Sequence, residues 1–351
     1  MKLPQSKLWA LVRCCEWAVV MAMSVAVASG CRTTAAHPPA NSDAAGVRAG
    51  DERITLSNHH VRLGVSVNTG RLLEFGPREG TNLLWLNDEA LDQPLPEPGT
   101  PLQARRSAYR NYGGDKVWPT VQGLWARAYG SGSTWPPDGV IDGQPWRLLV
   151  HEPQRIVMRS DVHPTLNVYC EREIHLDPDR PTARITNRLT RVAPSLFPVH
   201  IWTITQVRQP QAVLLDVAPD RVADLPWVAL DTPRESVEQN VRWLDETVAA
   251  WRFPREPAGK IGTLGRWIAG VWEEWVFLQT VDDYDPAAAY PDASNVQAFA
   301  DDRYTELELL SPFVHLQPGE SVEHTVTWHL LPRRGRSVEQ VIEALQAVRE
   351  D

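Results

Sequence analysis

Hydrophobic and polar residues alternate along much of the chain, which is the pattern of β-strands that bury one face. β-branched and aromatic residues, which favour strands, are common in the alternating segments. Before residue 210 these segments are Ile54–Val67, Arg155–Val162, Leu166–Leu176, Thr182–Val192 and His200–Val207. Turn-forming residues such as Asn68-Thr69-Gly70 and Asp177-Pro178-Asp179 separate them. The pattern predicts an all-β chain.

The second half of the chain continues the strand pattern over Trp267–Val281, Tyr304–Leu316 and Ser321–Pro332. A Gln-Pro-Gly-Glu turn separates the last two of these segments. Helical spacing appears at the C-terminus, where Val338, Val341, Ile342 and Leu345 form one stripe and Ser337 is a candidate N-cap. We therefore expect a short helix over residues 337–351, beside a β domain.

The domain organisation is indicated by the segments between these strands. No linker of the kind that separates domains interrupts residues 51–336, and the 29 prolines of the chain are scattered rather than grouped in a spacer. Two facing sheets would let each alternating strand bury one side. The sequence predicts one large antiparallel β-sandwich over residues 51–336.

Residues 1–30 have the features of a secretory signal peptide. Lys2, Lys7 and Arg13 give a basic start, Ala18–Ala28 is an apolar core, and small residues follow it. Eleven apolar residues are too few for a membrane-spanning helix, which needs about 20. We expect this segment to be removed on export.

The residue that follows the small residues is Cys31. The sequence VASGC resembles the lipobox of bacterial lipoproteins, and this resemblance implies that Cys31 is lipidated and begins the mature chain. The alternative is an ordinary secretory signal with an incidental cysteine. Residues 31–50 are rich in Ala, Pro, Thr and Ser and predict a flexible tether. Because Arg32 stands where an aspartate would favour the inner membrane, we expect a cell-envelope protein anchored in the outer membrane.

Charge and cysteine content limit the partners. Removing residues 1–30 changes 35 basic against 44 acidic residues into 32 against 43, a formal charge of −11. With that charge and no basic patch, we expect no nucleic-acid partner. Cys14 and Cys15 leave with the signal peptide, so Cys170 has no disulfide partner, and its alternating surroundings predict a buried structural residue.

Several segments, taken in their order, resemble the galactose mutarotase-like superfamily, which includes aldose 1-epimerases. Val61–Leu86 resembles its opening strands, YCEREIHLDPDRPTARITNRLTRV its central hairpin, and YTELELLSPFVHLQPGESVEHTVTWHL its closing strands. GGDKVWPTVQ resembles a Gly-Gly-x-x-x-x-Pro segment of the hexose-phosphate branch. The nearest resemblance is to a branch of secreted proteins of unknown function. It implies a β-supersandwich with a sugar on its concave face.

The resemblance also implies roles for particular residues. In the superfamily's enzymes a glutamate removes the proton of the anomeric hydroxyl and a histidine protonates the ring oxygen, without a cofactor. On this chain Glu306 matches the position of the base, with Glu308 two residues further on, and His200 with the aromatic Trp202 matches the acid. Glu273 is a rival for the catalytic carboxylate. Solvated glutamates and a structural histidine are the alternatives.

The segment around Gly113-Gly114 suggests how a sugar would be held. Trp118 and Trp125 would offer flat apolar faces from loops, with hydroxyl partners in Asp115, Lys116 and Gln122. Plugging of the sandwich ends is the alternative role of the tryptophans. Tyr112 stands where the hexose-phosphate enzymes have an arginine for phosphate, so we expect a neutral sugar or glycan end.

Two functions of different class remain open. One is an enzyme that interconverts the anomers of a neutral aldose, and the other is a lipoprotein that binds carbohydrate without turnover or serves a structural role, because one fold hosts many functions. No metal motif appears, since the acidic residues of VDDYDP lack calcium-loop spacing. We expect a monomer without cofactor or metal.

Overall fold

The computed structural model describes residues 48–97, 100–128, 132, 134–137, 139–218, 240–244, 247–252, 258–337 and 340–341. The predicted signal peptide, Cys31 and nearly all of the tether lie outside the described residues. Most of the predicted helix over residues 337–351 lies outside them too. The described residues are therefore essentially those of the predicted β domain.

The described strands form two antiparallel sheets, which confirms the all-β prediction. The first sheet has eight strands in the order β1-β2-β3-β4-β9-β17-β16-β13. Their bounds are β1 Arg53–Ser57, β2 Val61–Ser66, β3 Arg71–Pro77, β4 Asp115–Trp118, β9 Trp202–Val207, β17 Thr305–Leu310, β16 Val296–Ala300 and β13 Gly259–Thr263. Strands from distant parts of the chain therefore lie side by side in this sheet, with β9 between β4 and β17.

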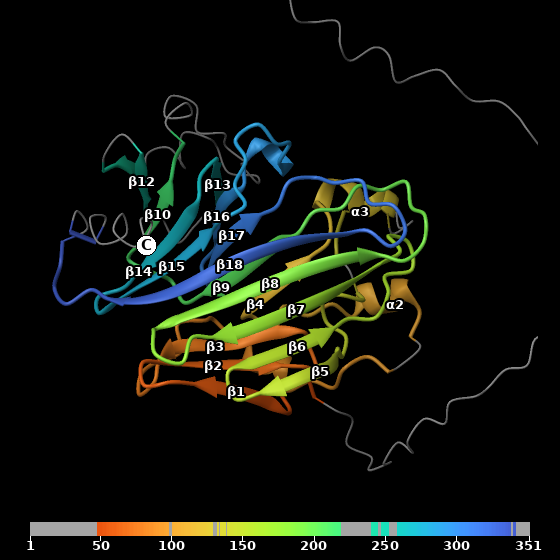
Figure 1. The fold of residues 1–351 in the computed structure, drawn as a ribbon, viewed down its shortest axis with the longest axis horizontal. Helices are drawn as coiled ribbons and strands as arrows, with labels where there is room; N and C mark the ends of the chain where they lie inside the picture. The colour runs from red at the N-terminus through yellow and green to blue at the C-terminus, as the bar shows by residue number, and fades with distance from the viewer. Residues whose placement is uncertain are drawn as a thin grey trace, which may run out of the picture. The chain divides into compact units, whose positions relative to one another are not determined.

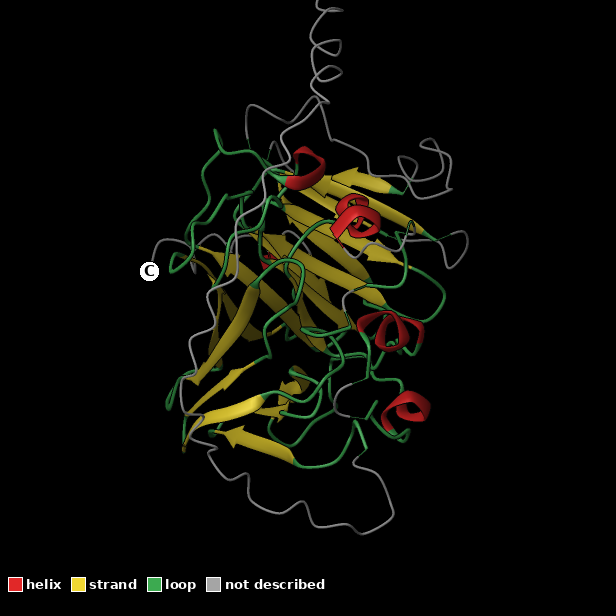
Figure 2. Cartoon of the chain, turned by 90° about the vertical axis from the view of Figure 1, so that its right-hand side faces the viewer, coloured by secondary structure: helices red, strands yellow, loops and turns green. Residues whose placement is uncertain are grey.

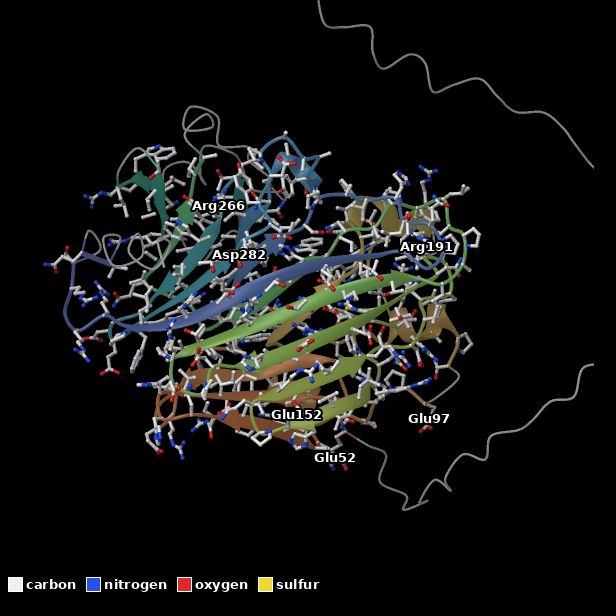
Figure 3. The ribbon with its side chains drawn as sticks, viewed as in Figure 1. Glu52, Glu97, Glu152, Arg191, Arg266 and Asp282 are labelled. Atoms are coloured by element: carbon white, nitrogen blue, oxygen red, sulfur yellow. The ribbon has the colours of Figure 1, made fainter. Side chains whose placement is uncertain are left out.

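The second sheet has ten strands in the order β11-β12-β10-β14-β15-β18-β8-β7-β6-β5, and it faces the viewer in Figure 1. Their bounds are β11 Val241–Trp243, β12 Val248–Trp251, β10 Ala212–Asp216, β14 Trp267–Val271, β15 Trp275–Val281, β18 Ser321–Pro332, β8 Thr182–Arg191, β7 Val168–Leu176, β6 Arg155–Arg159 and β5 Arg147–Glu152. Charged side chains on this sheet, such as Glu152 on β5, are exposed (Figure 3).

Aromatic side chains from both sheets meet in the core. Phe75 of β3 packs against Phe277 of β15 and Trp328 of β18, with ring centroids 4.9 and 5.1 Å away. Such offset and edge contacts add to the free energy of burial. Cys170 of β7 is fully buried, as its alternating surroundings predict.

One buried ion pair also joins the sheets. Arg172 of β7 is paired with Asp115 of β4, and both side chains are buried. Thr205 Oγ1 donates a second hydrogen bond to Asp115 at 2.8 Å, and Arg172 also donates to the carbonyl of Gly70 at 2.9 Å. Asp115 therefore faces the interior between the sheets.

The helices of the described chain are short and lie along one flank of the strands (Figure 2). They are α1 Asp88–Leu91, α2 Leu102–Ser107, α3 Gln122–Ala128 and the 3-10 turn Pro291–Ala293. No helix in this part of the chain has both the length and the apolar character needed to cross a membrane.

The observed strands refine the predicted ones. Ser321–Pro332 is one strand as predicted, and Arg155–Val162, Leu166–Leu176 and Thr182–Val192 contain β6, β7 and β8. Ile54–Val67 and Trp267–Val281 each fold back into a hairpin, so each is two strands. The placement of the tryptophans in long loops was wrong for Trp118 and Trp125, which lie in β4 and α3.

Candidate functional site

A cavity of about 710 Å³ lies on the face of the eight-stranded sheet that is turned away from the ten-stranded sheet. Its base comes from β4, β9, β17, β16 and β13, which contribute Lys116, Trp118, Trp202, Glu306, Leu310, Gln297, Phe299 and Lys260. Volumes of this size are usual for small-molecule sites. The segments before and after the short helices form its walls.

Strand register explains why these side chains share one face. Trp118 of β4 lies opposite Trp202 of β9, and Trp202 lies opposite Leu310 of β17. Because side chains alternate along a strand, residues two positions apart point the same way. Lys116 therefore accompanies Trp118, while Asp115 points to the other side of the sheet.

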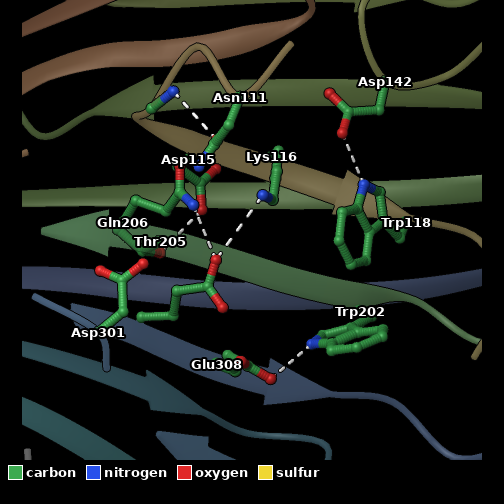
Figure 4. A network of polar contacts seen from close by, with 12 residues as sticks. Asn111, Asp115, Lys116, Trp118, Asp142, Trp202, Thr205, Gln206, Asp301 and Glu308 are labelled. Carbon is green, nitrogen blue, oxygen red and sulfur yellow. Dashed lines mark hydrogen bonds and ion pairs between the residues drawn. The ribbon is translucent and has the colours of Figure 1, made fainter. Parts of the chain in front are cut away.

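Glu306 presents its carboxylate to the cavity. Gln206, which lies opposite it on β9, donates a hydrogen bond from Nε2 to Glu306 Oε1 at 2.8 Å. Lys116 Nζ lies 3.7 Å from the same oxygen (Figure 4). Burial lowers the pKa of Lys116, although Glu306 opposes this shift. A carboxylate and an ammonium group are thus held together at the cavity surface.

Glu308 lies on the same face of β17 but beneath the cavity surface, where it is fully buried. Its Oε2 accepts hydrogen bonds from Lys260 Nζ at 2.6 Å and from Trp202 Nε1 at 2.8 Å. Burial raises the pKa of Glu308 to about 7, against the opposing effect of Lys260. This second carboxylate therefore titrates near neutral pH.

The two indoles at the base of the cavity are fixed by acidic partners. Trp118 Nε1 donates to Asp142 Oδ2 at 2.7 Å (Figure 4). Asp142 is also paired with the buried Arg71. The rings of Trp118 and Trp202 are perpendicular, with centroids 5.1 Å apart. Each ring has a lysine ammonium 4.6 Å from its centroid, Lys116 over Trp118 and Lys260 over Trp202.

The walls add both aromatic and hydrogen-bonding groups. One wall comes from residues 121–123 at the start of α3, together with Thr134 and Trp135, and includes the side chain of Gln122. The opposite wall includes an ion pair of Arg303 with Asp301, at 2.7 Å. Tyr109 and Tyr304 complete the aromatic lining.

Five of the residues selected from the sequence line the cavity: Glu306, Lys116, Trp118, Trp202 and Gln122. His200 does not line it. Its ring is fully buried, and neither ring nitrogen has a hydrogen-bond partner within the described structure. Burial, together with the nearby His324, lowers the pKa of His200 to about 3. His200 therefore has a structural environment, and we do not assign it the role of an acid on a ligand.

Four other sequence-selected residues lie away from the cavity. Asp115 is bound by Arg172 between the sheets, and Trp125 is fully buried in α3, where its Nε1 donates to the carbonyl of Thr120 at 3.2 Å. Tyr112 is buried against Arg71. Glu273 is exposed in the turn between β14 and β15, because that segment is a hairpin rather than one strand.

Sequence reasoning missed several residues of the cavity, notably Lys260, Phe299, Tyr109 and Tyr304. Lys260 is one of only four lysines in the sequence, and an isolated lysine between Gly259 and Ile261 could have signalled a buried cation. No group of His, Cys, Asp and Glu side chains among the described residues has the arrangement of a metal site.

Comparison with models of protein families gives a match over the β domain. A family model described as a domain of unknown function, DUF4380, matches residues 52–331. The comparison with curated proteins gives no match.

Similar solved structures include proteins from the superfamily that the sequence resembles. A candidate aldose 1-epimerase of Escherichia coli K12 has 15% identity and a TM-score of 0.49, covering 80% of this chain and 99% of that chain. A galactose mutarotase related enzyme of Lactobacillus acidophilus has 8% identity and a TM-score of 0.49, covering 80% and 97%. A galactose mutarotase-like protein of Lactobacillus casei has 8% identity and a TM-score of 0.48, covering 80% and 100%.

Proposed function

The chain belongs to the family of domains of unknown function DUF4380, and from that premise and the geometry of the cavity we propose that it binds a neutral sugar ring or glycan end. The observation that carries the proposal is the combination of aromatic rings with hydrogen-bonding groups in one cavity of about 710 Å³. Aromatic faces pack against the C–H surfaces of a sugar, while carboxylate, amide and ammonium groups bond its hydroxyls.

The charges of the cavity favour a neutral ligand. Lys116 is paired with Glu306, Lys260 with Glu308, and Arg303 with Asp301. Each of these three cations of the described cavity lining thus already has a carboxylate partner. A phosphate or sulfate would have to compete with these partners for the same donors.

Binding can be tested with the full chain on a glycan array, followed by calorimetry with the glycans it retains. Glu306→Gln keeps the shape of the side chain but removes its charge, and we expect at least tenfold weaker binding, since a hydrogen bond to a charged group contributes about 1.5–3 kcal/mol. Glu274→Gln changes an exposed glutamate in the β14–β15 turn and serves as the matched control. Retention of no glycan would overturn the proposal.

A second candidate is exchange between the anomers of a bound aldose. The observation that favours it is that Glu306 and Lys116, 3.7 Å apart, both face the cavity and could reach the two oxygens attached to one anomeric carbon. Glu306 would take the proton of the anomeric hydroxyl while Lys116 gives a proton to the ring oxygen. The bond from the anomeric carbon to the ring oxygen breaks and the aldehyde forms. Rotation about the C1–C2 bond then turns the other face of the aldehyde toward the ring hydroxyl, and the reverse proton transfers close the ring as the other anomer.

Exchange NMR on D-glucose and D-galactose tests this candidate. We expect wild type to accelerate the exchange, and both Glu306→Gln and Lys116→Met to remove the acceleration, because each transfers one of the two protons. Glu274→Gln should exchange sugar like wild type. A wild-type rate equal to the uncatalysed rate would rule out turnover and leave sugar binding as the function.

We also propose that the protein is a lipoprotein of the bacterial cell envelope, anchored through Cys31 in the outer membrane. The support is the sequence VASGC after an apolar segment, with Arg32 following the cysteine. Metabolic labelling with an alkyne fatty acid should mark wild type but not Cys31→Ser, while Cys170→Ser should label normally. Equal labelling of wild type and Cys31→Ser would contradict the anchor, and membrane fractionation would locate the labelled protein.

A further inference from the structure

Trp135 differs from the other tryptophans of the cavity in its exposure. Half of its surface, 51%, is exposed, whereas Trp118 and Trp202 are 6% and 8% exposed. The indoles at the base therefore expose little ring surface to a ligand, whereas Trp135 exposes much more. It lines the cavity from the wall beside α3.

The exposed ring is held in place from two sides. It is perpendicular to the ring of Tyr109, with centroids 5.5 Å apart and planes at 89°, and its centroid lies 6.2 Å from that of the buried Trp125. The next residues are tied to α2, because Arg106 Nε donates to the carbonyl of Pro136 at 3.1 Å and to that of Pro137 at 3.3 Å. An aromatic ring fixed before binding costs a ligand little conformational entropy.

The neighbouring part of the cavity wall leaves room for a ligand beside this ring. Gly123 at the start of α3 lines the cavity, and a Cβ atom at this position would meet no atom within 4 Å. Gln122 next to it lines the cavity as well and carries both donors and acceptors. Thus Trp135, the open space at Gly123 and Gln122 all lie along the wall of the cavity, whereas Lys116 and Glu306 belong to strands of its base.

On the premise of the proposed function, we propose that Trp135 forms an outer subsite, and that the ligand is an oligosaccharide rather than a free monosaccharide. The terminal sugar ring would occupy the base of the cavity near Glu306, and the next ring would stack on Trp135. The exposed indole then contributes an apolar platform, and Gln122 bonds the hydroxyls of the outer ring.

The test compares an oligosaccharide with its own terminal monosaccharide on the full chain. A glycan array first identifies an oligosaccharide that wild type retains, and calorimetry and NMR titration then give both dissociation constants. We expect wild type to bind the oligosaccharide at least tenfold more tightly than the monosaccharide. Trp135→Ala should remove most of that tenfold difference, because it lowers the affinity for the oligosaccharide by more than the affinity for the monosaccharide.

Two further variants keep the result interpretable. Trp243→Ala removes another exposed tryptophan, which is 39% exposed on β11 and does not line the cavity, and it should change neither affinity. Trp135→Phe keeps an aromatic face and should restore part of the oligosaccharide affinity. The outer subsite alone would be overturned if wild type retains a glycan but binds the oligosaccharide and its terminal monosaccharide with equal affinity. It would also be overturned if Trp135→Ala weakens the binding of both ligands equally. Retention of no glycan would instead overturn the proposed function.

Discussion

Lys260 Nζ, at the base of the cavity, lies 2.6 Å from Oε2 of Glu308, whose side chain lies beneath the base and has no exposed surface. An ion pair removed from water costs several kcal/mol in desolvation for each ion and depends on its partner for compensation. Lys260 stands on β13 and Glu308 on β17, with β16 between the two strands. This pair therefore connects β13 to β17 across β16. Removing either side chain should destabilise the fold, because the other charge would stay buried without a partner.

Removal of the lysine should destabilise the protein in a pH-dependent manner. In Lys260→Met the Glu308 carboxylate has no cationic partner, so we expect the free energy of unfolding to fall by about 3–5 kcal/mol at pH 8. At pH 5 the loss should be smaller, because Glu308 can then take up a proton. Urea unfolding at both pH values measures the difference. Equal losses at pH 5 and pH 8 would contradict a titrating Glu308 beneath the cavity.

The titration of Glu308 should also appear in the wild-type protein. Its folded pKa of about 7 is above its usual value of 4.5, so the folded state binds this proton more tightly than the unfolded state. The stabilisation is present in full below about pH 4.5 and is lost as the pH rises through about 7, with a total on the order of 3 kcal/mol.

Glu308→Gln isolates this contribution, because an amide does not titrate in this range. We expect the stability advantage of wild type over Glu308→Gln to shrink between pH 5 and pH 8 in urea unfolding. Glu274→Gln, in an exposed turn, should differ from wild type by a constant amount. An advantage that grows with pH would mean that the folded pKa of Glu308 is below its usual value.

His200 should have the opposite pH dependence at lower pH. Its folded pKa of about 3 is below the usual 6.5, so the unfolded state binds the proton more tightly, and stability is lost as the pH falls below about 6.5. The total loss by pH 4 is on the order of 3 kcal/mol.

His200→Phe should lose less stability between pH 7 and pH 4.5 than wild type in urea unfolding, and it should bind the same glycans as wild type. His151→Phe, on exposed β5, is the control and should follow wild type. Loss of glycan binding in a folded His200→Phe would restore a role for this residue in the site.

The ion pair between the sheets should be important for stability but not for ligand contact. Asp115→Asn leaves Arg172 buried without its carboxylate partner, and we expect the free energy of unfolding to fall by about 3 kcal/mol or more. Asp161→Asn removes the partner of Arg147 in an exposed pair and should cost less than about 1 kcal/mol. Urea unfolding compares the two. A change below about 1 kcal/mol in Asp115→Asn would show that the pair contributes little net stability.

The alternating strands were predictable because they bury one face. β7, β8 and β18 alternate between buried and more exposed positions over most of their length, and their sequences alternate in the same way. By contrast, β10 and β13 are buried at every position, on both faces of their sheets. Their sequences carry no period-two signal, so these strands and Lys260 were not predicted.

The position of a residue along its strand predicted which face of the sheet its side chain is on, but not how deeply that side chain is buried. Glu306 and Glu308 were expected on one face of their strand, as they are, yet one lines the cavity and the other is fully buried beneath it. The exposure of a side chain on the sheet depends on which other segments cover it, and the segments that form the cavity walls are far away in the sequence. Trp118 and Trp125 show the same effect, because their rings pack against each other with centroids 4.9 Å apart, yet Trp118 lines the cavity and Trp125 is fully buried.

The strand order of the cavity base has a consequence for the newly synthesised chain. β9 pairs with β4, which precedes it, and with β17, which is made near the end of the chain. Until β17 is complete, β9 has one unpaired edge, and non-local pairing of this kind slows folding. A nascent chain would therefore leave Trp202 and Ile204 open to wrong partners until late in its synthesis. A chaperone that shields this edge until β17 is made would act on the same strand that later lies in the middle of the cavity base.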